Sequence, residues 1–106
     1  MKKLNLGDDF AMHLPEVFKY RGREVYKIKN NLIHYGRPND RFVAVLVVLG
    51  TEEYRGYKIS SPLSVELQIN NPKLTVKERV VKKGEAENLY KALELAHVWL
   101  TQANGE

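Results

Sequence analysis

The chain has 106 residues, the length of one domain, and 43% of them are hydrophobic while 28% are charged. This balance is typical of a folded globular protein and excludes a largely disordered chain. There is no cysteine, which excludes disulfides and thiolate metal sites, so we expect a single domain over 1–106 in a reducing compartment such as the cytoplasm.

The formal net charge of +4 is unevenly placed along the chain. Residues 18–42 hold seven Lys or Arg and two acidic residues, whereas acidic residues slightly outnumber basic ones elsewhere. Such an asymmetry indicates an acidic or polyanionic partner. The longest apolar run, FVAVLVVLG at 42–50, is too short to cross a bilayer, so we expect no membrane contact.

The first expected elements are a short N-terminal turn and a hairpin. Residues 1–16 are expected to be irregular, or to form a short helix that Asp8 caps and that stops before Pro15. From 17 to 35 apolar and basic residues alternate, which predicts two strands joined by a turn around residues 20–22.

The length of this loop decides which side chains share a face. A two-residue loop, Arg21-Gly22, would pair Tyr20 with Arg23. A three-residue loop with Gly22 in the left-handed conformation shifts the register by one residue. We prefer the longer loop, because only that register separates charged from apolar side chains. It places Lys19, Arg23, Lys27 and Lys29 on one face with Val25, and Phe18, Tyr26 and Ile28 on the other.

Residues 42–80 predict further strands. The segment 42–49 is apolar throughout, which is typical of a central strand covered on both sides. The EEYRG segment turns the chain, and 57–60 begins the next strand. Over 61–70, Val65, Leu67 and Ile69 alternate with polar residues and predict a strand, although Ser61-Pro62 is also a good helix start. After a turn at 70–73, a further strand is predicted over 74–80.

Gly84 is expected to end the sheet, and residues 85–103 predict an amphipathic helix. Its apolar stripe recurs at helical spacing from Ala86 through Leu93 to Leu100. The expected fold is therefore α+β. An antiparallel meander of about five strands over 17–83 precedes a C-terminal helix that packs on one face of the sheet.

Two stretches, KYRGREVYKIK at 19–29 and EYRGYKIS at 53–60, place an aromatic residue, an arginine and a glycine at expected turns. Glycine at a hairpin turn needs no functional explanation. If both tips lie on the same side, however, their cations could neutralise phosphates and their rings could stack on unpaired bases. The residues expected to bind nucleic acid are Lys19, Tyr20, Arg21, Arg23, Lys27, Lys29, Tyr35, Arg37, Arg41, Tyr54, Arg55, Tyr57 and Lys58.

We therefore expect a non-catalytic nucleic-acid-binding protein that prefers single-stranded or irregular DNA or RNA. A protein-interaction module, such as an adaptor or inhibitor encoded by a mobile element, is the second hypothesis. A small metal-independent ribonuclease is the third, with acid, base and phosphate-binding roles for His34, Tyr35, Arg37, Lys27 and Glu24. No motif of a hydrolase, a phosphate-binding loop or a metal site is present, so no cofactor and no metal are expected.

The predicted helix is apolar on a second side, where Leu95, Val98 and Trp99 project away from the main stripe. One explanation is that the N-terminal segment folds over this side. The other is a homodimer or partner interface, for which a tryptophan beside aliphatic residues is a common anchor. Because a domain of this size has only a modest core, we expect an oligomer slightly more than a monomer.

Overall fold

The computed structural model describes residues 17–29, 31–50, 52–54, 57–60 and 62–106. Eight strands and two helices are assigned among them. The strands are β1 (Val17–Tyr20), β2 (Arg23–Lys29), β3 (Leu32–Tyr35), β4 (Phe42–Val48), β5 (Glu52–Tyr54), β6 (Tyr57–Ser60), β7 (Leu63–Ile69) and β8 (Val80–Ala86), and the helices are α1 (Val76–Arg79) and α2 (Leu89–Ala103).

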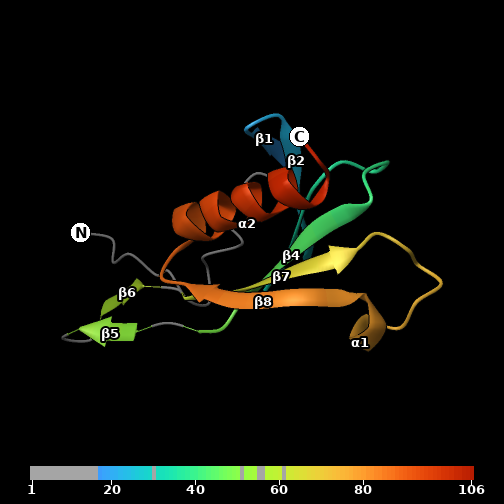
Figure 1. Cartoon of the computed structure of the whole chain (residues 1–106). Coiled ribbons are helices and arrows are strands. Elements are labelled where there is room, and N and C mark those ends of the chain that lie inside the picture. Colours follow the sequence, from blue (N-terminus) through green and yellow to red (C-terminus); the bar gives the residue numbers. More distant parts are fainter. Residues whose placement is uncertain (1–16, 30, 51, 55–56, 61) are drawn as a thin grey trace.

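Six of the strands form one antiparallel sheet in the order β1-β2-β3-β4-β7-β8. Strands that follow each other in the chain are therefore neighbours in space, except where β5 and β6 are inserted as a separate hairpin, here called the arm. The long helix α2 packs on one face of the sheet, over β4, β7 and β8 (Figure 1). The α+β class, with a meander followed by a C-terminal helix on one face, is confirmed, and β7 confirms the strand predicted over 61–70.

The hairpin of β1 and β2 has a two-residue loop, so the three-residue loop that we preferred is wrong. Tyr20 pairs with Arg23, and both loop residues are left-handed, with a φ of 49° at Arg21 and 81° at Gly22. Two successive left-handed residues are the mark of the type I′ turn, whose twist matches that of the flanking strands.

This register mixes charged and apolar side chains on both faces of the hairpin. Arg23 lies beside Val25 on the face that α2 covers, and Phe18, which pairs with Val25, lies there too. Lys19 and Tyr26 point to the opposite face. The expected basic face is not formed, because the guanidinium of Arg23 finds its partners inside the fold instead of in water.

The first hairpin and the arm leave the sheet at opposite ends. Near the β1–β2 turn, Val25 pairs with Tyr35, which pairs in turn with Ala44 close to the start of β4. The arm instead follows the end of β4 and projects away from the body of the protein (Figure 1). The strands of the arm and the turn between β1 and β2 therefore lie at opposite ends of the sheet. Arg55 lies outside the described residues.

The chain between β7 and β8 differs from the prediction. One helical turn, α1, replaces the strand expected over 74–80, and a reciprocal capping box between Thr75 and Glu78 stabilises its start. Gly84 lies inside β8 and does not end the sheet. The helix α2 begins at Leu89, directly after the N-cap residue Asn88, and not at residue 85 as predicted.

The core fills the space between α2 and the sheet. Ala92, Leu93, Ala96 and Leu100 face inward from α2 and pack on buried side chains of the sheet such as Leu46. The expectation that β4 is covered on both sides is not met among the described elements, because α2 covers only one face.

The second apolar side of α2 packs largely on β8. A Cβ added at Gly84 would lie 3.1 Å from Cη2 of Trp99 and 3.7 Å from Cδ2 of Leu95, so this glycine makes room for the indole ring. The ammonium of Lys82 lies 4.8 Å from the centre of the same ring. Leu95 and Trp99 are half-buried and Val98 is exposed. The suggested contact with residues 1–16 lies outside the described residues.

Candidate functional site

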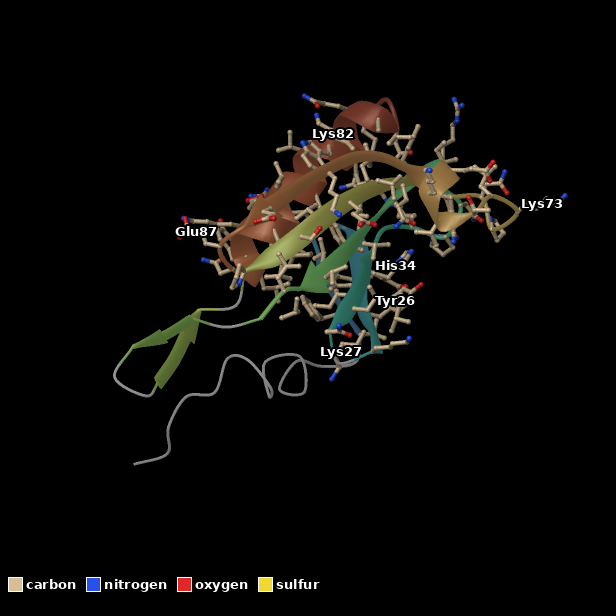
Figure 2. The ribbon with its side chains drawn as sticks, turned by 90° about the horizontal axis from the view of Figure 1, so that it is seen from below. Tyr26, Lys27, His34, Lys73, Lys82 and Glu87 are labelled. Carbon is tan, nitrogen blue, oxygen red and sulfur yellow. The ribbon has the colours of Figure 1, made fainter. Side chains whose placement is uncertain are left out.

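The face of the sheet opposite α2, here called the open face, is the candidate site. Figure 2 views the protein from this side and shows Tyr26 and His34 on it. One row of directly paired residues crosses five strands of this face: Tyr26 on β2, His34 on β3, Val45 on β4, Glu66 on β7 and Lys83 on β8. The row brings an aromatic ring, an imidazole, a carboxylate and an ammonium group onto one surface.

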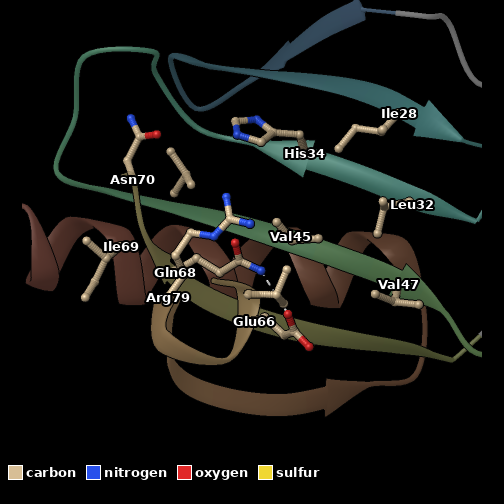
Figure 3. Close-up of a pocket in the computed structure, with 12 residues that line it drawn as sticks. Ile28, Leu32, His34, Val45, Val47, Glu66, Gln68, Ile69, Asn70 and Arg79 are labelled. Carbon is tan, nitrogen blue, oxygen red and sulfur yellow. Dashed lines mark hydrogen bonds between the residues drawn. The ribbon is translucent and has the colours of Figure 1, made fainter. Parts of the chain in front are cut away.

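A groove of about 440 Å³ runs along this face (Figure 3). Its floor is mainly aliphatic, because β4 presents a valine at every second position. A few polar groups are set among these apolar side chains, an arrangement common in binding sites. The residues that line this open-face groove are Ile28, Leu32, His34, Val43, Val45, Val47, Glu66, Gln68, Ile69, Asn70, Val76 and Arg79.

The rings of Tyr26 and His34 stack beside the groove. Their centroids are 4.7 Å apart and their planes differ by 23°. The two residues are directly paired on neighbouring strands, which is what brings the rings together. Burial lowers the pKa of His34, so the imidazole is neutral near pH 7. Its Nδ1 is buried and has no hydrogen-bond partner among the described residues.

Arg79 brings a cation to the groove. It is the last residue of α1, whose capped helical turn fixes the direction in which the side chain leaves the backbone. In Figure 3 its guanidinium reaches over the groove toward β4 and Val45. The Nε of Arg79 is buried and, within the described part of the chain, has no hydrogen-bond partner.

Glu66 brings the one carboxylate among the groove-lining residues. Its Oε1 accepts a hydrogen bond of 2.9 Å from Nε2 of Gln68, and its Oε2 lies 3.9 Å from Nζ of Lys83. Gln68 is buried, whereas Lys83 is mostly exposed. The carboxylate is therefore held in place on the floor of the groove, where a ligand could reach it.

Three of the five arginines that we expected to bind nucleic acid are engaged with carboxylates of the same chain. Arg21 donates from Nε and Nη2 to the two oxygens of Glu94, at 2.9 and 2.6 Å. Nη2 of Arg23 donates to Glu106 at 2.8 Å, and Nη1 of Arg37 donates to the same carboxylate at 3.0 Å. These contacts place Arg21 beside Glu94 of α2, and Arg23 and Arg37 beside Glu106, which follows that helix.

The other predicted residues are dispersed over the protein. Tyr35 is fully buried and donates its hydroxyl to the backbone carbonyl of Tyr20, which is itself half-buried. Lys19 and Lys29 are exposed beside the open face, Arg41 is exposed at one end of the sheet, and Lys27 is half-buried. Tyr54, Tyr57 and Lys58 belong to the strands of the arm.

Sequence reasoning did not identify Tyr26, Glu66, Gln68 or Arg79 as site residues, and it gave His34 a catalytic role only in the nuclease hypothesis. One signal was available. The segment 42–49 is apolar on both faces, yet the chain predicts a single long helix, which can cover only one of them. The uncovered face of that strand was therefore the place to look for a site.

The chain matches no family model, and no curated protein and no solved structure is detectably similar to it. Within the described residues there is no cluster of three or more His, Cys, Asp or Glu side chains that could hold a metal ion. No helix in the described part of the chain has the length and apolar character needed to span a membrane.

Proposed function

We propose that the chain is a non-catalytic nucleic-acid-binding protein that holds single-stranded or irregular DNA or RNA along the open-face groove. One observation carries the proposal: a stacked pair of rings, Tyr26 and His34, stands beside an aliphatic groove that Arg79 also lines, on the sheet face opposite α2.

Each part of the groove suits one part of a single strand. Unpaired bases have apolar faces, which fit the valine floor and the ring of Tyr26, and stacking of this kind is worth about 1–3 kcal/mol per base. Arg79 and the flanking cations, Lys19 and Lys29, suit the phosphates. In a regular duplex the faces of the bases are hidden, so the floor favours unpaired nucleic acid.

The proposed binding surface is therefore the open face and not the hairpin tips. The sequence pattern pointed to the tip arginines, but Arg21, Arg23 and Arg37 each have a carboxylate partner within the chain. A phosphate would have to displace those partners, whereas Arg79 has no ion pair with a described residue and already reaches over the groove.

The experiment is a titration of fluorescently labelled single-stranded DNA, single-stranded RNA and duplex DNA, followed by anisotropy at two salt concentrations. Arg79→Ala should weaken binding and lower the slope of log affinity against log salt by about 1, because one phosphate contact is lost. Tyr26→Ala should weaken binding with little change in slope. Arg21→Ala is the matched control, since it removes the same charge from the opposite side of the sheet.

Two results would contradict the proposal. One is the absence of salt-dependent binding at micromolar protein. The other is an equal loss of affinity in Arg79→Ala and Arg21→Ala, which would mean that binding follows net charge and not the groove. The first result would leave the protein-interaction hypothesis as the stronger one, with the apolar floor as the surface for a protein partner.

A further inference from the structure

The carboxylate of Glu66 requires a specific explanation if the groove binds nucleic acid. It lies in the middle of the open face, and only 17% of its side chain is exposed. Phosphates repel a carboxylate, and the ammonium of Lys83, 3.9 Å away, offsets its charge only in part. On a surface for a polyanion such a group is unfavourable, unless its oxygens bind part of the ligand.

An ionised carboxylate only accepts hydrogen bonds, so it selects a base edge that presents adjacent donors. Guanine has two such donors side by side, N1–H and the 2-amino group, which match the two oxygens of a carboxylate. On the corresponding edges of adenine and cytosine an acceptor lies next to the amino group, and on uracil or thymine the single N–H lies between two carbonyl oxygens. Those acceptors would face a negatively charged oxygen.

We propose that Glu66 selects an unpaired guanine in the open-face groove, by accepting hydrogen bonds from N1–H and the 2-amino group of the base. This inference rests on the proposed function. It also explains a preference for single strands, because this edge of guanine is occupied by cytosine in a duplex.

The surroundings of Glu66 support this role. The hydrogen bond from Gln68 fixes the orientation of the carboxylate and leaves Oε2 with only the long contact to Lys83 among the described residues. Val45 lies between Glu66 and His34 in the row, so the two backbones are roughly 10 Å apart, two strand spacings. One base can lie over Val45 between them, where Arg79 reaches over the groove (Figure 3).

The test uses labelled oligouridines of one length that carry a single central G, A, C or inosine, or U alone. The protein should bind the G probe about tenfold more tightly than the A, C and U probes, since a bidentate contact of this kind discriminates by about that factor. Inosine, which lacks the 2-amino group, should fall between G and the others. A 7-deazaguanine probe keeps both donors and should bind like G.

Glu66→Gln should abolish the preference for G, because the amide of glutamine brings a donor to the donors of guanine. Glu85→Gln is the matched control: Glu85 lies on β8 on the same face and is exposed, so the change in charge is equal. Both variants should bind all probes somewhat more tightly, but only Glu66→Gln should lose selectivity. Thermal unfolding would verify that both variants are folded.

The outcomes separate this inference from the function on which it rests. Salt-dependent binding with equal affinity for all probes, or a preference for G that persists in Glu66→Gln, overturns the role of Glu66 and leaves nucleic-acid binding intact. If no probe binds, the proposed function fails and the guanine site fails with it.

Discussion

The guanidinium of Arg23, on the second strand, is buried and donates from Nη2 to the carboxylate of Glu106, 83 residues later, at 2.8 Å. Its Nη1 lies 2.8 Å from Nδ1 of His97 on α2. A second contact lies nearby: the side chain of Asn104 accepts a hydrogen bond from the backbone N–H of Phe42 and donates one to the backbone carbonyl of the same residue. The C-terminal end of α2 is thus fastened to both β2 and β4.

We predict that Glu106→Gln lowers the free energy of unfolding by about 1 kcal/mol, because a buried guanidinium loses a charged partner while water still reaches the site. Arg23→Ala should cost more, about 3 kcal/mol, because it also removes the packing of the side chain. Urea unfolding followed by circular dichroism measures both values. Arg23→Met should recover part of the loss, because it restores apolar contact and leaves Glu106 exposed to water.

The control for this pair is Glu87→Gln, which breaks the exposed ion pair of Glu87 with Lys91 on α2. Exposed pairs contribute little, so the change should stay within about 0.5 kcal/mol. If Glu106→Gln is as mild as Glu87→Gln, the contact with Arg23 does not hold the helix to the sheet.

Stability should fall as the pH drops below about 6.5. Burial, and after it the charges of Arg23 and Arg21, lower the pKa of His97, and burial lowers that of His34. In the unfolded chain both return to about 6.5, so below that pH the unfolded state binds more protons and is favoured. Above it, both histidines are neutral in either state and the dependence vanishes. Urea midpoints measured from pH 8 to 5 should therefore be level at first and then decrease, and His97→Gln should reduce the decrease.

A second loss is expected below about pH 4.5. The hydrogen bonds from Arg21 hold the pKa of Glu94 below its ordinary value. The stability that this pair contributes is therefore present above the pKa of the unfolded chain and is lost as the pH falls through the lower, folded value. In Glu94→Gln this second loss should be smaller. An unchanged acid limb in that variant would show that other carboxylates determine it.

Gly84→Ala should destabilise the fold by about 1–3 kcal/mol, because the new methyl group would lie 3.1 Å from the ring of Trp99. Trp99 is the only tryptophan, so its fluorescence reports directly on the displacement of the ring. Adding Trp99→Phe should make Gly84→Ala less costly, a coupling that a double-mutant cycle measures. Independent, additive effects would mean that the indole does not pack on β8 in solution.

Gly22→Ala should cost about 1 kcal/mol, because the φ of 81° at this position is unfavourable for a residue with a side chain. Gly22→Asn should be milder, since asparagine adopts this conformation more readily. The three-residue loop also needs a left-handed residue here, so the cost alone does not distinguish the loops. Cross-strand backbone NOEs that pair Tyr20 with Arg23 would identify the two-residue loop.

Patterns of period two and 3.6 predicted the α+β class, the strand over 61–70 and the C-terminal helix, because burial on one face leaves a direct trace in the sequence. The hairpin register was not predictable in this way. The assumption that charges face water fails at Arg23, whose partners Glu106 and His97 lie more than 70 residues away. Similarly, the sequence did not predict that β8 continues past Gly84 to Ala86, because this end of the strand depends on the pairing of Ala86 with Leu63 on β7.

The candidate site was difficult to predict for the same reason: its residues come together only through contacts between distant parts of the chain. Tyr26, Glu66 and Arg79 are ordinary residues in the sequence. The pairing of strands β2 to β8 brings Tyr26 and Glu66 to one face, and the helical turn α1 brings Arg79 to the same groove. The charge excess of residues 18–42 was visible at once, but three of its seven cations are compensated by Glu94 and Glu106.

That compensation has a consequence for how the protein assembles. The guanidinium groups of the first hairpin meet their acidic partners only across 73 and 83 residues of chain. A ribosome-bound fragment lacking α2 would carry Arg21 and Arg23 without their counter-charges, and the four buried core side chains of α2 would be missing. Productive folding should therefore wait until α2 and Glu106 have been synthesised and then proceed in one cooperative step, at the slow rate typical of contacts so distant in sequence.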